Sequence, residues 1–208
     1  MGEVHGRLDG FLELKLFDGV DDHSMSDYLA LIRERFKIRS ILKILYIGGQ
    51  KSGKSALAIQ KALALSTQRK PIYIATYLNN YNDSGMQERI DNHNIQREGN
   101  FITIEEGLNL KKVFNQHNGV FLIDCLSIWL FNKLEIKTSK EKIIQEIEEI
   151  IKLDKDMIFI LNDVSSGVIP INRLSRDFVD LSGIIGQIIA QEADEVYQII
   201  CGLENRLK

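Results

Sequence analysis

The residues that most clearly suit a chemical role form one short loop. They are Gly48, Gly49, Gln50, Lys51, Ser52, Gly53, Lys54 and Ser55, which together match the phosphate-binding pattern G-x-x-x-x-G-K-S. Glycines in such a loop let backbone N–H groups point at phosphate oxygens, and the helix that follows adds its positive dipole end. The catalytic candidate Lys54 can reach the β- and γ-phosphates of a nucleoside triphosphate, and Ser55 can offer its hydroxyl to Mg²⁺.

The surroundings of this loop decide between two interpretations. A Gly/Ser turn could match the pattern by chance. The loop, however, follows the apolar run 44–47 and precedes a stretch rich in Ala and Leu. A strand before the loop and a helix after it are the context that the motif requires, and they favour nucleotide binding.

A carboxylate ends another apolar run. Asp124 closes the segment GVFLID, which is predicted to be a buried strand. In phosphate-loop proteins an acidic residue at such a strand end helps to hold Mg²⁺. Asp124 therefore joins Ser55 as a metal candidate and also belongs to the predicted nucleotide site. The alternative role is a carboxylate that caps the next helix.

Further polar residues fall at expected strand ends and helix starts. Asn162 follows the apolar segment MIFIL, and Arg173 and Arg176 lie on the first turns of the next predicted helix. Glu105 ends the strand predicted over residues 101–105. We expect all four to bind nucleotide, because ligands of parallel sheets gather at the carboxyl ends of the strands. An ordinary surface loop with a helix start is the alternative.

A histidine between two arginines forms a second candidate group. Arg89, His93 and Arg97 are spaced i, i+4, i+8 and share one face of the helix predicted over residues 84–97. Two guanidinium groups can bind the phosphates of a nucleotide. An imidazole between them could attack phosphorus if it is kept neutral. A solvated basic face is the equally weighted alternative.

Composition narrows the class of protein. The chain has 208 residues, of which 44% are hydrophobic and 26% charged, and its net charge is -3. These values fit one α/β domain and give no broad basic field for nucleic acid. We expect no stable membrane insertion and a cytoplasmic location, since no uninterrupted apolar run is long enough to span a bilayer and the first residues do not resemble a signal peptide. The two cysteines, Cys125 and Cys201, are expected to be small buried side chains.

Strand and helix patterns alternate from residue 43 onward. Strands are expected at 43–48, 71–76, 101–105, 120–124, 157–161 and 195–201, and helices at 54–66, 84–97, 108–116, 139–153 and 173–192. This alternation predicts an α/β fold in which helices cover both faces of a mostly parallel sheet. Residues 1–40 are expected to form an N-terminal extension without evident chemistry, and residues 41–208 the nucleotide-binding domain.

Several segments, taken in order, resemble one protein family. It is the bifunctional adenosylcobinamide kinase / adenosylcobinamide-phosphate guanylyltransferase family of cobalamin biosynthesis. The matching segments are GGQKSGKS at 48–55, YIAT at 73–76, MQERIDNH at 86–93, LIDCLSIWLFN at 122–132, NDVSSGVIPINRLSRDF at 162–178 and GQIIAQEADEVY at 186–197. The resemblance covers residues 43–208.

The resemblance implies a RecA-like P-loop NTPase fold, a homotrimer and two reactions. In the first, a nucleoside triphosphate (ATP or GTP) phosphorylates the hydroxyl of the aminopropanol arm of adenosylcobinamide. In the second, GTP loads GMP onto a histidine, and the phosphorylated corrinoid takes it to give adenosylcobinamide-GDP. Some relatives have adjacent histidines where this chain has Asn92 and His93. Their assigned nucleophile aligns with Asn92, so His93 is the remaining candidate.

Two other functions stay open at this point. One is a kinase-only relative whose histidine does not accept GMP, and the other is a non-catalytic nucleotide-binding module. The departures from the family pattern at Asn92, Val179 and Gly186 favour these alternatives. The bifunctional enzyme is favoured by the joint retention of Lys54, Ser55, Asp124, Arg89 and His93.

Overall fold

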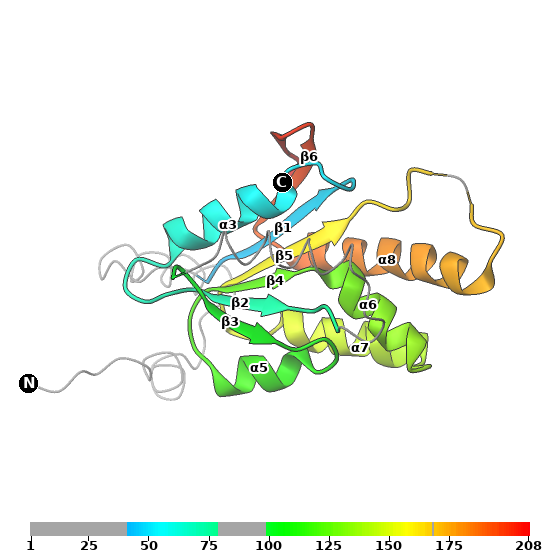
Figure 1. Ribbon diagram of the computed structural model, residues 1–208, viewed down its shortest axis with the longest axis horizontal. Coiled ribbons are helices and arrows are strands. Elements are labelled where there is room, and N and C mark those ends of the chain that lie inside the picture. The colour runs from blue at the N-terminus through cyan, green and yellow to red at the C-terminus, as the bar shows by residue number, and fades with distance from the viewer. Residues whose placement is uncertain (1–40, 79–98, 168) are drawn as a thin grey trace, which may run out of the picture. The chain divides into compact units, whose positions relative to one another are not determined.

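The computed structural model describes residues 41–78, 99–167 and 169–208. These residues form one seven-stranded sheet with helices on both faces (Figure 1). The strands are β1 (Lys43–Gly48), β2 (Ile72–Ala75), β3 (Ile102–Glu105), β4 (Phe121–Asp124), β5 (Met157–Asn162), β6 (Glu195–Ile200) and β7 (Leu203–Arg206). The helices are α3 (Lys54–Leu65), α5 (Leu110–Gln116), α6 (Leu126–Glu135), α7 (Lys140–Ile151) and α8 (Arg173–Glu192).

The strand order brings the two phosphate-loop signatures close together. The order is β3-β2-β4-β5-β1-β6-β7, and every pairing is parallel except that of β6 with β7. A single strand, β5, therefore separates β1, which leads into the phosphate loop, from β4, which ends at Asp124. The predicted α/β fold, a mostly parallel sheet with helices on both faces, is confirmed.

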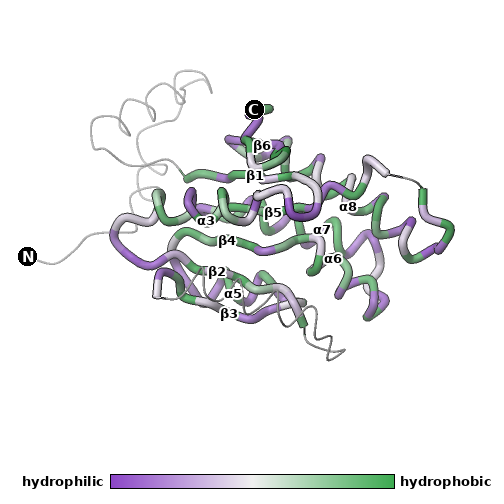
Figure 2. Tube along the Cα trace, turned by 45° about the horizontal axis from the view of Figure 1, so that its top comes forward, coloured by the Kyte–Doolittle hydropathy of each residue, from purple (hydrophilic) through white to green (hydrophobic). Residues whose placement is uncertain are grey.

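Two cores cover the two faces of the sheet because consecutive strand residues point to opposite sides. In β1, Leu45 packs with the apolar sides of α5, α6, α7 and α8, whereas Ile44 and Tyr46 pack with α3. Figure 1 shows α3 on one face and those four helices on the other. In Figure 2 the tube of α3 alternates green with purple, as expected for a helix with one buried side.

Local capping explains where three helices begin. The side chain of Asn109 accepts a hydrogen bond from the amide of Lys112 at 3.1 Å, so α5 starts at residue 110. Ser139 caps α7, and Asn172 caps α8 through the amide of Leu174 at 2.8 Å. Side-chain oxygens at these positions satisfy amides that have no partner inside the helix.

Two elements were not predicted, and one side-chain prediction was wrong. Helix α6 and strand β7 have no counterpart among the expected elements. Cys201 is exposed, against the expectation of a buried side chain, because it lies in the turn between β6 and β7 with a φ of 53°. The helix predicted at 84–97 and the extension at 1–40 lie outside the described residues. Within the described part of the chain, no helix is both long enough and apolar enough to cross a membrane.

Replacing Trp129 with alanine tests the core that the sheet forms with helices α5, α6, α7 and α8. Trp129 is fully buried in α6, and its Nε1–H donates to the carbonyl of Leu108 at 3.1 Å. Trp129→Ala removes both the packing and this bond and should lower the free energy of unfolding by about 3–5 kcal/mol. Urea unfolding measures the effect. In the control, Ile136→Ala removes a side chain that is 60% exposed and should cost less than about 0.5 kcal/mol; equal losses in the two variants would contradict this assignment of the core.

Candidate functional site

The phosphate loop joins the end of β1 to the start of α3 through a tightly curled backbone. Lys51 has a φ of 55° and Gly53 a φ of 96°, both in the left-handed region. The amide of Ser52 donates to the carbonyl of Gly49 at 3.2 Å, which closes the curl. The predicted sequence of strand, loop and helix is therefore confirmed at this position.

Two of the loop glycines are required by close approach. A Cβ on Gly48 would lie 2.6 Å from the carbonyl oxygen of Ile199 and 2.7 Å from Oγ of Ser52. A Cβ on Gly53 would lie 3.2 Å from Cα of Gly202, at a φ that side chains rarely adopt. Gly49, in contrast, has open space around its Cα, with nothing within 4 Å of a built Cβ.

The loop presents a set of free backbone donors. The amides of residues 50–51 and 53–56 donate to no other described residue, whereas the amide of Leu57 already bonds to the carbonyl of Gly53 at 3.2 Å. The first N–H groups of a helix have no partner inside the helix. Such donors, combined with the positive dipole end of α3, make a site for anionic phosphate.

Lys54 adds a nearly buried cation to these donors. Its side chain is 6% exposed, and its Nζ donates to the carbonyl of Gly49 at 3.0 Å. Burial lowers the pKa of the Lys54 ammonium, and the Asp124 carboxylate partly opposes this shift. The two predicted site residues therefore interact electrostatically, although Lys54 begins helix α3 and Asp124 ends strand β4.

Asp124 is held by a tyrosine from the neighbouring strand. The hydroxyl of Tyr73 in β2 donates to Oδ2 of Asp124 at 2.5 Å. Tyr73 is 3% exposed and packs edge-on against Phe101, with ring centroids 5.8 Å apart. One carboxylate oxygen is thus engaged, while Oδ1 accepts no hydrogen bond from the described residues. No role was predicted for Tyr73, because it stands at one more apolar position of a buried strand.

The backbone just after Asp124 is fastened by Thr76. The hydroxyl of Thr76 donates to the carbonyl of Cys125 at 2.8 Å and accepts from the amide of Cys125 at 3.0 Å. The fully buried Thr76 is held in turn by Nδ2 of Asn132, which donates to its carbonyl at 2.8 Å. These contacts tie the end of β4 to the end of β2 and to α6.

Asn162, a predicted nucleotide-binding residue, is the last residue of β5 and lies beside the start of the loop. It is the register partner of Gly48, and its amide donates to Oγ of Ser127 in α6 at 2.8 Å. The next amide, that of Asp163, donates to the carbonyl of Gly48 at 2.9 Å. Although burial acts in the opposite direction, hydrogen bonds from the serines at 165 and 166 hold the pKa of the Asp163 carboxyl below its usual value.

Of the three other predicted nucleotide-binding residues in the described part of the chain, one lies at the same end of the sheet as the loop and two lie at the start of α8. Glu105 reaches the same edge of the sheet, since Ala75 is the register partner of both Glu105 and Asp124. Arg173 is 90% exposed and lies 3.9 Å from Asp177 of its own helix. Arg176 donates to the carbonyl of Pro170 at 3.1 Å, within the segment that leads into α8. The described contacts of both arginines thus stay near the start of α8.

The second predicted group cannot be placed in the same way. Arg89, His93 and Arg97 lie outside the described residues, as does Asn92. Their assignment to nucleotide binding and to catalysis therefore stays a prediction.

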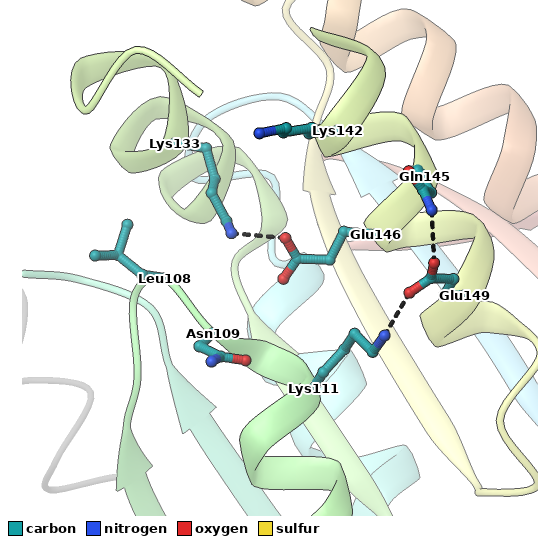
Figure 3. A pocket seen from close by; sticks show the side chains of 8 residues that line it. All are labelled: Leu108, Asn109, Lys111, Lys133, Lys142, Gln145, Glu146 and Glu149. Atoms are coloured by element: carbon teal, nitrogen blue, oxygen red, sulfur yellow. Dashed lines mark hydrogen bonds and ion pairs between the residues drawn. The ribbon is translucent and has the colours of Figure 1, made fainter. Parts of the chain in front are cut away.

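A separate hollow lies between α5, α6 and α7, away from the phosphate loop. Its volume is about 380 Å³, and it is lined by Leu108, Asn109, Lys111, Lys133, Lys142, Gln145, Glu146 and Glu149. Figure 3 shows that side chains inside it pair with one another: Lys133 with Glu146 at 2.6 Å, and Gln145 with Glu149 at 2.9 Å. No predicted site residue lines this hollow, so the phosphate loop remains the candidate functional site.

The fold and the site together define a phosphate-loop nucleotide-binding protein. The family model described as "Cobinamide kinase / cobinamide phosphate guanyltransferase" matches residues 44–207. The chain belongs to this family, and the resemblance seen in the sequence is confirmed.

Curated relatives agree with this assignment. The chain is 32% identical over 176 residues to the bifunctional adenosylcobalamin biosynthesis protein CobP of Pseudomonas aeruginosa, an alignment that covers 80% of this chain and 98% of that protein. It is 27% identical over 186 residues to the bifunctional adenosylcobalamin biosynthesis protein CobU of Escherichia coli, covering 80% of this chain and 100% of that protein. Among solved structures it resembles the flagellar accessory protein FlaH from Methanocaldococcus jannaschii, with 17% identity, a TM-score of 0.47 and coverage of 85% and 83% of the two chains.

The two cysteines should differ sharply in reactivity. Burial, together with the Asp124 carboxylate, raises the pKa of the Cys125 thiol to about 12, so this group stays protonated at neutral pH. Cys201 is exposed. Because the thiolate is the reactive form, iodoacetamide at pH 8 should alkylate Cys201 and spare Cys125, and mass spectrometry of tryptic peptides can check this. In denaturant both should react, and alkylation of Cys125 in the folded protein at the same rate as Cys201 would contradict the raised pKa of its thiol.

Proposed function

We propose that this protein phosphorylates adenosylcobinamide with a nucleoside triphosphate and then transfers GMP from GTP to the phosphorylated product. The observation that carries the proposal is the nearly buried Lys54 ammonium beside the free amides of the phosphate loop, with Asp124 acting on the same ammonium. Membership in the cobinamide kinase / cobinamide phosphate guanyltransferase family supports both steps.

In the kinase step the loop binds the triphosphate through its backbone donors. The hydroxyl oxygen of the aminopropanol arm forms a bond to the γ-phosphorus, the bond to the β–γ bridging oxygen breaks, and the nucleoside diphosphate leaves. Lys54 stabilises the negative charge that develops on the transferring group. Either ATP or GTP satisfies these contacts, because they involve only phosphates.

The residues at the edge of the sheet fit a magnesium ion that accompanies the triphosphate. Ser55 and Asp124 offer a hydroxyl and a carboxylate, which are hard oxygen donors of the kind that Mg²⁺ prefers. Oδ1 of Asp124 accepts no hydrogen bond from the described residues, while Tyr73 holds Oδ2. The ion, when bound, neutralises charge on the β- and γ-phosphate oxygens.

In the second step we assign the nucleophile to His93. A neutral ring nitrogen attacks the α-phosphorus of GTP, pyrophosphate leaves, and GMP remains attached through a P–N bond. The phosphate of the phosphorylated corrinoid then attacks this phosphorus and releases the histidine. Arg89 and Arg97, one helical turn to either side in the predicted helix, bind phosphates and discourage protonation of the ring. The histidine-containing segment MQERIDNH supports this assignment by its resemblance to the family.

The kinase-only function remains the second candidate. It is favoured by Asn92, which stands where some relatives carry the assigned nucleophile. A homotrimer and a cytoplasmic location complete the proposal, the trimer on the strength of the family resemblance.

Removing the Lys54 ammonium should abolish the kinase step. Lys54→Ala takes away the cation that stabilises the transferring phosphoryl group, and the rate should fall by about a hundredfold or more. Transfer of γ-labelled phosphate to adenosylcobinamide measures this. Lys70→Ala, which changes an exposed lysine before β2, is the matched control and should keep the rate of the unmodified protein. A kinase rate in Lys54→Ala equal to that of Lys70→Ala would remove the loop lysine from the mechanism.

Replacing His93 separates the two steps. After incubation with GTP labelled in its α-phosphate, the unmodified protein should retain label in denaturing electrophoresis through an acid-labile, base-stable bond. His93→Ala should lose this label and the GDP-corrinoid product but keep the kinase step, whereas His117→Ala, at the end of α5, should keep both. Label that persists in His93→Ala would place the nucleophile elsewhere, and absence of label in the unmodified protein would favour the kinase-only function.

A further inference from the structure

The turn of the β6–β7 hairpin contacts the phosphate loop directly. The amide of Gly202 donates to the carbonyl of Ser52 at 2.8 Å. On the same side, a Cβ on Gly48 would lie 2.6 Å from the carbonyl oxygen of Ile199, and a Cβ on Gly53 would lie 3.2 Å from Cα of Gly202. The loop is therefore packed against hairpin backbone at three of its residues, without intervening side chains.

The hairpin also contacts β1, which precedes the loop, and α3, which follows it. Tyr197 of β6 stacks on Tyr46 of β1, with ring centroids 5.1 Å apart and planes at 18°. Glu195 of β6 pairs with Lys61 of α3 at 2.7 Å. The strand before the loop, the helix after it and the loop itself are consequently tied to one hairpin.

The hydrogen bond from Gly202 has a specific consequence for phosphate binding. The Ser52 carbonyl and the Gly53 N–H belong to one planar trans peptide, in which the two groups point in opposite directions. Holding the carbonyl toward Gly202 therefore turns the Gly53 N–H away from the hairpin. That N–H donates to no other described residue, so it is available to a phosphate oxygen. Rotation of this peptide would instead offer phosphate a carbonyl oxygen, which repels it.

We infer that the β6–β7 hairpin is a positioning element of the phosphate loop and that Gly202 is its positioning residue. The Gly202 turn fixes the orientation of the Ser52–Gly53 peptide before nucleotide arrives. Preorganised donors of this kind need no rearrangement when the charged ligand binds. The inference rests on the proposed function, since it assumes that the loop binds nucleotide phosphates.

The backbone conformation of Gly202 allows this role to be tested without a steric clash. Its φ is 83°, but a Cβ at this position would meet nothing within 4 Å. A β-branched residue disfavours such a φ, whereas asparagine tolerates it. Gly99 provides a matched control, with a φ of 77° and equally open space. It precedes β3, whose first residues lie at the sheet edge opposite the loop.

Calorimetric titration with ADP and Mg²⁺, combined with thermal unfolding of each variant, provides the test. Gly202→Val should raise the Kd for ADP about tenfold, which corresponds to the loss of about one oriented hydrogen bond to phosphate. Gly202→Asn should restore the Kd to within about twofold of the unmodified protein, since asparagine adopts the required φ. Gly99→Val should lower the unfolding temperature as Gly202→Val does but leave the Kd unchanged. If Gly202→Val does not fold, Gly202→Ala, with a smaller side chain, replaces it.

The outcomes separate this inference from the proposed function. ADP affinity in Gly202→Val equal to that of the unmodified protein would overturn the positioning role alone. An equal loss of affinity in Gly99→Val would also overturn it, because the effect would then follow general destabilisation. Failure of the unmodified protein to bind any ADP would overturn both the inference and the proposed function.

Discussion

The buried ammonium of Lys54 is the interaction on which the rest of the site depends. A charge removed from water is costly unless it is paired or hydrogen-bonded. Within the described residues its Nζ has one hydrogen-bond partner, the carbonyl of Gly49, and burial lowers its pKa. A phosphate bound in the loop would supply the missing negative charge. The free amides around the loop and the positive dipole end of α3 also favour the binding of an anion.

The edge of the sheet is organised by polar contacts between strands that are far apart in the sequence. Tyr73 holds one oxygen of Asp124, and Thr76 fastens the backbone that follows it. Ser127 links the start of α6 to the end of β5 beside the loop. The Gly202 turn completes this arrangement from the other side. Because these partners are buried or backbone groups, the site geometry is largely set before any ligand binds.

The sequence predicted the elements whose hydrophobic pattern is uniform and missed those whose pattern is interrupted or short. The limits of β1 and α8 were predicted correctly, because an apolar run and a long amphipathic helix define them. Helix α6 was missed, since it begins two residues after Asp124 and its first turns are almost as apolar as β4, so no helical alternation of apolar and polar residues marks its start. Strand β7 has four exposed residues and no alternation that marks a strand. The roles of Tyr73 and Gly202 required the strand order, which places β2 beside β4 and β6 beside β1 and which local patterns do not specify.

In the proposed function, the loop around Lys54 delivers a phosphoryl group to a corrinoid hydroxyl. The most direct measurement is a single-turnover reaction of the unmodified protein with γ-labelled triphosphate and adenosylcobinamide, followed by chromatography of the corrinoid. We expect label to appear on the corrinoid in step with the formation of nucleoside diphosphate. Release of the label as inorganic phosphate alone, or no consumption of triphosphate, would contradict it.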